Sequence, residues 1–165
     1  MSLTNLQLRD RFSTLTTPLI ADACVRLGRD LRCAPPDLLA LVPGKPIVGR
    51  VLAVRHYGSV DVFLNALESA EEGDILAIDN GGRRDEACVG DPVALESRSA
   101  GLAGMVVWGA VRDTAELVAI GLPVYCIGRC PAGPKGSLDR TPSGHTLGAR
   151  REGPPYACGG LARGI

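Results

Sequence analysis

The pattern of apolar and polar positions along the chain predicts a mixture of helices and strands. The second helix is expected over 19–27, with Thr17 as its cap, Pro18 at its first position and Gly28 at its end. Helix-like spacing also covers 3–15, 61–70, 92–100 and 114–120. Apolar runs typical of strands cover 47–54, 75–79, 104–108 and 123–127. The proline-rich stretch 34–44 is expected to be a loop.

Strands and helices alternate from residue 75 to residue 127, which predicts an α/β fold with parallel strands and right-handed crossovers. Ligands of such sheets gather at the carboxyl ends of the strands. Two loops should lie at that edge, Asn80–Gly82 and Gly109–Asp113. The glycines of the first loop allow positive φ angles and a close backbone approach to a ligand.

Composition and charge restrict the classes of function. The 165 residues, 45% of them hydrophobic, fit one domain, expected over 1–140, with an irregular tail at 141–165. Because 18 acidic and 18 basic side chains cancel and no basic run precedes the tail, nucleic acid is not expected as a partner. No apolar run is long enough to span a membrane, and the polar N-terminus is unlike a signal peptide, so we expect a cytoplasmic protein. The six cysteines form no CxxC pair and are interpreted as ordinary core or surface residues.

Two acidic residues and an arginine are the strongest candidates for chemistry. Asp91 is followed, after twenty intervening residues, by Arg112 and Asp113. Both acids also have a structural interpretation, since Asp91 can cap the helix that follows it and Asp113 forms a capping-box pattern with Glu116. Spacing alone leaves these interpretations open.

Arg112 is harder to explain structurally, because it follows an apolar strand beside the small residues Gly109 and Ala110. A guanidinium above the sheet, near helix N-termini, suits a carboxylate ligand. The neighbouring Asp113 suits a hard cation such as Mg²⁺. We therefore predict that Asp91, Arg112 and Asp113 converge on a divalent cation and a small carboxylate ligand.

The other polar residues carry less weight. His56 at a strand end is expected to be a hydrogen-bonding surface residue, and His145 lies in the tail. Asp22 is expected on an exposed helical face. No GxGxxG fingerprint follows a strand, which disfavours a nucleotide-type cofactor site.

Four segments resemble the family that holds the 4-hydroxy-4-methyl-2-oxoglutarate aldolases and the regulators of ribonuclease E activity. Many members of that family carry the older label of dimethylmenaquinone methyltransferase. The matching segments are Thr17–Ala23, Gly73–Gly82, Gly104–Asp113 and Leu122–Gly128. The resemblance extends over residues 13 to 131, and the Gly-Ala-Val-Arg-Asp stretch with its upstream acid is its specific signal.

The resemblance implies a fold and a reaction. The fold would be a phosphohistidine-like swivelling domain, a layered α/β sandwich with βαβ units, assembled into homotrimers or homohexamers. The reaction would be aldol cleavage or decarboxylation of a 2-oxo acid, either 4-hydroxy-4-methyl-2-oxoglutarate or oxaloacetate, through the enolate of pyruvate. The implied cofactor is Mg²⁺, Mn²⁺ or another divalent cation.

The resemblance also implies roles for individual residues. Asp113 would hold the metal, Arg112 would bind the carboxyl and keto end of the substrate, and Asp91 would act as general base. The substrate would be lined by Gly90, Asp91, Pro92, Val93 and Arg112.

Three departures from the family pattern stand out. Pro92 has no N–H, so Val93 would be the remaining backbone donor of its loop. Trp108 is bulky where many relatives have a small or polar residue, and residues 140–165 lack the closing Gly-Asp and Asp-x-x-Gly-Val stretches. The alternative function is a non-catalytic regulator that binds a ribonuclease or another protein, although such relatives tend to lack the complete acidic motif.

Overall fold

The computed structural model describes residues 3–56 and 58–134; the predicted tail 141–165, with His145, lies outside the described residues. Its centre is a six-stranded sheet with the order β1-β6-β5-β3-β2, in which β4 pairs with β5. The strands are β1 Leu39–Ala40, β2 Val51–Arg55, β3 Ile75–Asp79, β4 Ala87–Val89, β5 Gly104–Val111 and β6 Val124–Arg129. All pairs are parallel except β1 with β6. The predicted α/β fold is confirmed, whereas its assignment as a swivelling domain stays a prediction.

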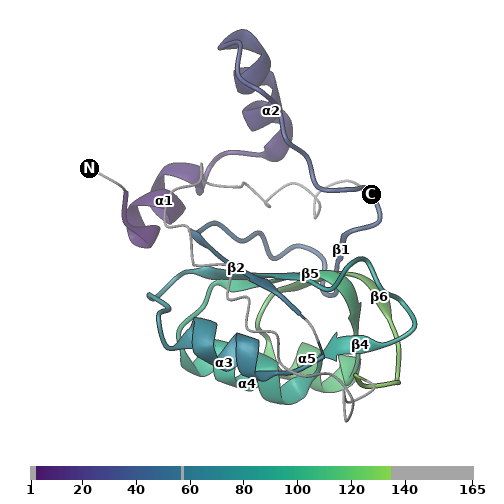
Figure 1. Ribbon diagram of the computed structural model, residues 1–165. Coiled ribbons are helices and arrows are strands. Elements are labelled where there is room, and N and C mark those ends of the chain that lie inside the picture. Colours follow the sequence, from purple (N-terminus) through teal and green to yellow (C-terminus); the bar gives the residue numbers. More distant parts are fainter. Residues whose placement is uncertain (1–2, 57, 135–165) are drawn as a thin grey trace.

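The helices lie on both sides of the sheet. They are α1 Asn5–Phe12, α2 Thr17–Arg26, α3 Asp61–Leu67, α4 Asp91–Ser99 and α5 Thr114–Ile120. Helices α3, α4 and α5 cover one face, and α1 and α2 lie beyond the other (Figure 1). Because α3, α4 and α5 each follow a parallel strand, they begin at the edge where those strands end. No helix in the described part of the chain is long and apolar enough to span a membrane.

Strand β3 shows why short apolar runs became buried strands. Leu76 and Ile78 belong to the larger core cluster with residues of α3, α4 and α5, whereas Ile75 belongs to the cluster that contains Tyr125 and Ile127 of β6. Successive side chains of a strand point to opposite faces, so a strand covered on both sides needs apolar residues throughout. The predicted range 75–79 therefore matches the structure at both ends.

Helix α1 is attached to the rest of the domain by the buried side chains of Asn5 and Leu8. The Asn5 side chain is buried; its Nδ2 donates to Asp74 Oδ1 at 2.7 Å, and its Oδ1 accepts from the Arg50 N–H at 2.8 Å. Thr4 and Gln7 form a capping box at the start of the helix. This network gives a short helix a defined place on the domain.

Helix α2 contributes no buried residue and stands away from the sheet (Figure 1). Its cap is Thr16, without a side-chain cap bond, so the prediction of Thr17 was wrong because the helix starts one residue earlier. Pro18 in the first turn, the left-handed Gly28 and the exposed Asp22 are as predicted. Leu19 and Val25 stay largely exposed, which leaves the apolar side chains of this helix available to a partner.

Several strand boundaries differ from the sequence prediction. Strand β2 begins only at Val51, although Ile47 is buried. Gly49 passes so close to the backbone of Gly73 that an added Cβ would lie 2.1 Å from its carbonyl oxygen, so this stretch packs against that turn. Strands β1 and β4 were not predicted, since runs of two and three residues carry no readable period. Strand β5 continues three residues beyond the predicted end, to Val111.

Candidate active site

Arg112 and Asp113 are the first two residues after the central strand. The Arg112 N–H donates to the carbonyl of Val89 at 2.9 Å, which holds this corner against the end of β4. The Arg112 Nε donates to Asp113 Oδ2 at 3.1 Å. The two side chains are 42% and 33% exposed. The pair is therefore ordered by the protein and still reachable from solvent.

The capping-box interpretation of Asp113 was wrong. Asp113 is the N-cap of α5, yet its side chain makes no cap hydrogen bond, because the carboxylate is turned toward Arg112. Its φ of 51° is left-handed, the only such angle among the described residues other than glycine. This conformation costs on the order of 1 kcal/mol and is found disproportionately at functional sites.

Gly90 brings the start of α4 to the same corner. A Cβ at Gly90 would lie 2.4 Å from Asp113 Oδ2 and 3.1 Å from Arg112 Nε, so only glycine fits here without a shift of these side chains. The approach follows from the parallel pairing of β4 with β5, which places Val89 opposite Val111. The pairing of β4 with β5 thus brings Gly90 next to Arg112 and Asp113, although about twenty residues separate them in the sequence.

Asp91 is the first residue of α4, and Gly90 is the N-cap, so the interpretation of Asp91 as a plain cap was also wrong. The Asp91 side chain is half-buried and forms no hydrogen bond or ion pair with the described residues. Pro92 is exposed, whereas the Val93 side chain is buried in the main core, which leaves only its backbone for a ligand.

A segment after β6 approaches the end of the Arg112 side chain. A Cβ at Gly133 would lie 2.5 Å from Arg112 Nη1. The segment is held by hydrogen bonds from the Ala87 N–H to the Ala132 carbonyl at 2.8 Å and from the Cys130 N–H to the Val111 carbonyl at 3.0 Å. No described residue accepts a hydrogen bond from either Nη nitrogen of Arg112. Sequence analysis missed Gly133, because nothing in a Gly- and Pro-rich stretch signals which side chain it will meet.

His56 and Asn80 form a second polar feature at the carboxyl ends of β2 and β3. His56 Nδ1 lies 2.9 Å from Asn80 Oδ1, and the imidazole stacks on Phe63 with ring centroids 5.3 Å apart. Both side chains are buried, so the prediction of a surface histidine was wrong, although its hydrogen-bonding role is confirmed. The pair joins α3 to the ends of β2 and β3, and His56 Nε2 and Asn80 Nδ2 are buried without a hydrogen-bond partner among the described residues.

The described cysteines are all free, and Cys88 and Cys126 are buried. Burial raises the pKa of Cys88 to about 12 and also raises the pKa of Cys126, which keeps both thiols protonated. Within the described residues no group of three His, Cys, Asp or Glu side chains could enclose a metal. A cation beside Asp113 would therefore keep water in most of its coordination positions, as Mg²⁺ commonly does.

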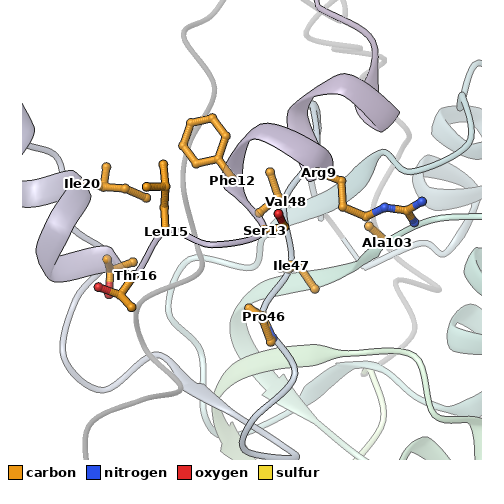
Figure 2. A pocket seen from close by; sticks show the side chains of 11 residues that line it. Arg9, Phe12, Ser13, Leu15, Thr16, Ile20, Pro46, Ile47, Val48 and Ala103 are labelled. Atoms are coloured by element: carbon orange, nitrogen blue, oxygen red, sulfur yellow. The ribbon is translucent and has the colours of Figure 1, made fainter.

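A cavity of about 300 Å³ lies between α1, α2 and the start of β5 (Figure 2). It is lined by Arg9, Phe12, Ser13, Leu15, Thr16, Thr17, Ile20, Pro46, Ile47, Val48 and Ala103. Ala103 precedes β5 and Arg112 follows it, so the cavity lies on the order of 25 Å from the Arg112 corner. Its lining is largely apolar and holds one charged side chain, which does not suit a substrate with two carboxylates.

Comparison with known proteins decides the family. The model of the RraA-like family, described as Aldolase/RraA, matches residues 17–145. The chain belongs to the RraA-like family. A Vibrio parahaemolyticus protein that carries the provisional name 4-hydroxy-4-methyl-2-oxoglutarate aldolase is 32% identical over 83 residues, 50% of this chain and 52% of that protein. The chain thus spans about half the length of this curated relative.

Two solved RraA structures share the fold. One is Streptomyces coelicolor RraAS2, described as an unusual member of the RNase ES inhibitor RraA family, with a TM-score of 0.68 at 24% identity over 79% of this chain and 68% of that one. The other is the RNA-processing inhibitor RraA of Thermus thermophilis, with a TM-score of 0.58 at 23% identity over 84% and 74%. At these identities the likeness establishes the RraA-like fold and not the activity.

Proposed function

We propose that this RraA-like protein is a divalent-metal-dependent lyase that cleaves or decarboxylates a 2-oxo acid. The substrate would be 4-hydroxy-4-methyl-2-oxoglutarate or oxaloacetate. The observation that carries the proposal is the meeting of Arg112, Asp113 and Gly90 at the solvent-accessible end of the central strand. The name of the Vibrio relative supports the same reaction class.

Arg112 would bind the carboxylate and the 2-oxo oxygen. Its Nε donates to Asp113, which orients the guanidinium, while neither Nη nitrogen has an acceptor among the described residues. A guanidinium end is well suited to two oxygens of one ligand. Because negative charge develops on the 2-oxo oxygen as the carbon–carbon bond breaks, a fixed cation there stabilises the transition state.

Asp113 would hold the metal, and the residues present fit a hydrated one. Only Oδ2 of Asp113 is bound to Arg112, so Oδ1 can face a cation or its waters. One carboxylate is enough for Mg²⁺ or Mn²⁺ that keeps most of its waters. A cation bound there supplies a Lewis acid for the 2-oxo acid.

Asp91 would act as general base for the aldol substrate. Its carboxylate has no partner among the described residues and lies one residue from Gly90, which contacts Arg112 and Asp113. Accepting the proton of the C4 hydroxyl lets that carbon become a carbonyl while the C3–C4 electron pair passes to C3 and the 2-oxo oxygen. Decarboxylation of oxaloacetate releases CO₂ and requires no such base.

Self-association belongs to the same proposal, as a homotrimer or homohexamer. The exposed Leu19 and Val25 of α2 support it, because a helix without buried residues gains stability by packing on another copy. A cytoplasmic location, the division into a domain of 1–140 and a tail, and the lack of nucleic-acid or membrane partners stay predictions.

Release of pyruvate tests the function. Purified protein should release pyruvate from oxaloacetate or 4-hydroxy-4-methyl-2-oxoglutarate with Mg²⁺ and lose that activity with EDTA. Arg112→Ala should lower kcat/KM by about a hundredfold or more. The matched control is Arg11→Ala, at an exposed position in the last turn of α1. Equal activity of wild type and Arg112→Ala would overturn the assignment.

The second candidate is a non-catalytic regulator that binds a ribonuclease. The names of the two RraA structures and the exposed apolar side chains of α2 favour it. A protein that releases no pyruvate from either substrate, yet slows RNA cleavage by a purified ribonuclease E-type enzyme, would establish this alternative.

A further inference from the structure

Two glycines from distant parts of the chain approach the Arg112 side chain. Gly90 approaches its Nε and Cγ, where an added Cβ would lie 3.1 Å and 3.3 Å away. Gly133 approaches its far end, where an added Cβ would lie 2.5 Å from Nη1 and 3.5 Å from Cζ. A van der Waals contact between carbon and nitrogen needs about 3.5 Å, so a methyl group at 133 and the present guanidinium cannot coexist.

We propose that Gly133 is a positioning residue for Arg112, and that its missing side chain determines where the guanidinium can bind a carboxylate. The segment 130–134 then forms one wall of the substrate site. This inference rests on the proposed function for its ligand, a 2-oxo acid, but its geometric part stands apart from catalysis.

The fold itself does not explain a glycine at this position. The backbone of Gly133 is not in the left-handed region, so no positive φ requires glycine there. Among the described residues, the only atoms within 4 Å of an added Cβ belong to the Arg112 guanidinium. The missing side chain at Gly133 therefore leaves the space that the Arg112 guanidinium occupies.

The guanidinium has to yield, because the backbone is held more firmly. Two backbone hydrogen bonds hold the segment against β4 and β5. The Ala87 N–H donates to the Ala132 carbonyl, and the Cys130 N–H donates to the Val111 carbonyl. The end of an arginine side chain moves at little cost, and at Arg112 only the Nε bond to Asp113 opposes the movement. Gly133→Ala should thus displace the charge by about 1 Å while leaving the fold intact.

The experiment compares Gly133→Ala with Gly128→Ala. Gly128 lies in β6, is also outside the left-handed region, and an added Cβ would meet only Arg84 Cγ at 3.9 Å, an ordinary contact. Two quantities are measured on the full chain with Mg²⁺, the NMR signal of the Arg112 Nε–H and the dissociation constant of pyruvate by calorimetry. Steady-state kinetics with oxaloacetate adds the separation of KM from kcat.

A positioning role predicts that Gly133→Ala shifts the Arg112 Nε–H signal and weakens pyruvate binding about tenfold or more, with a matching rise in KM. Gly128→Ala should change neither, and both variants should melt near the wild-type temperature. Unchanged pyruvate affinity and an unchanged Arg112 signal in Gly133→Ala would overturn the proposal.

A double-mutant cycle separates action through Arg112 from a general disturbance. In Arg112→Lys the ammonium ends near the place of Cζ, 3.5 Å from a Cβ at 133, where contact is ordinary. Gly133→Ala should therefore have no further effect on pyruvate binding in that background, and an equal loss in both backgrounds would contradict the inference. If the wild type binds and releases no pyruvate, the proposed function fails, while the Arg112 signal still decides the role of Gly133.

Discussion

Replacing Asp113 by asparagine distinguishes the effect of its negative charge from the effect of its left-handed backbone conformation. Asparagine tolerates the left-handed φ of 51° that this position adopts, and its side-chain carbonyl can still accept from Arg112 Nε. The variant therefore removes one negative charge and little else. Alanine at the same position removes the charge and also meets the left-handed strain.

The structure determines the expected magnitudes. The Arg112–Asp113 pair is 3.1 Å long with side chains 42% and 33% exposed, and such exposed pairs are worth about 0.2–1 kcal/mol. Asp113→Asn should lower the free energy of unfolding by less than about 1 kcal/mol, whereas Asp113→Ala should lose about 1–2 kcal/mol more through strain. Activity should fall about a hundredfold or more in both, because Lewis-acid stabilisation is worth several kcal/mol.

Two assays measure these effects. Pyruvate release is titrated with MgCl₂ for wild type, Asp113→Asn and Asp113→Ala, and urea denaturation gives the free energy of unfolding of each. An asparagine variant that keeps wild-type activity with the same Mg²⁺ dependence would refute the metal assignment. Equal destabilisation by asparagine and alanine would refute the claim that the left-handed backbone at Asp113 is strained.

Three further predictions concern stability and assembly. Gly49→Ala should lower the free energy of unfolding, measured by urea denaturation, by about 1–3 kcal/mol, because its Cβ would lie 2.1 Å from the backbone oxygen of Gly73. An unfolding free energy equal to that of wild type would contradict this prediction. Burial raises the pKa of the Cys88 thiol from 9.0 to about 12. The unfolded chain therefore loses this proton first, and the free energy of unfolding falls by about 1.4 kcal/mol per pH unit above pH 9. The urea midpoints at pH 8 and pH 10 should differ less in Cys88→Ala than in wild type. Leu19→Asp on the exposed face of α2 should lower the mass measured by light scattering, and an unchanged oligomer would exclude α2 from the interface.

Local patterns in the sequence determined the element types and the candidate residues. The apolar run of β3 and the helix α5, ended by the left-handed Gly121, occur where they were predicted, because burial on both faces and a glycine stop are properties of adjacent residues. The motif of Asp91, Arg112 and Asp113 was likewise visible without coordinates. These features need no knowledge of which distant segments meet.

Only the tertiary structure decided how those residues are used. Pairing of β4 with β5 set Gly90 against Arg112 and Asp113, and the turn after β6 set Gly133 against the guanidinium. The Asp113 carboxylate turned from its helix to Arg112, and α2 stayed off the core despite its apolar residues. The physical reason is the same in each case. Contacts between segments far apart in the chain depend on which strands pair and how side chains pack, and the local pattern of apolar residues contains no information on either.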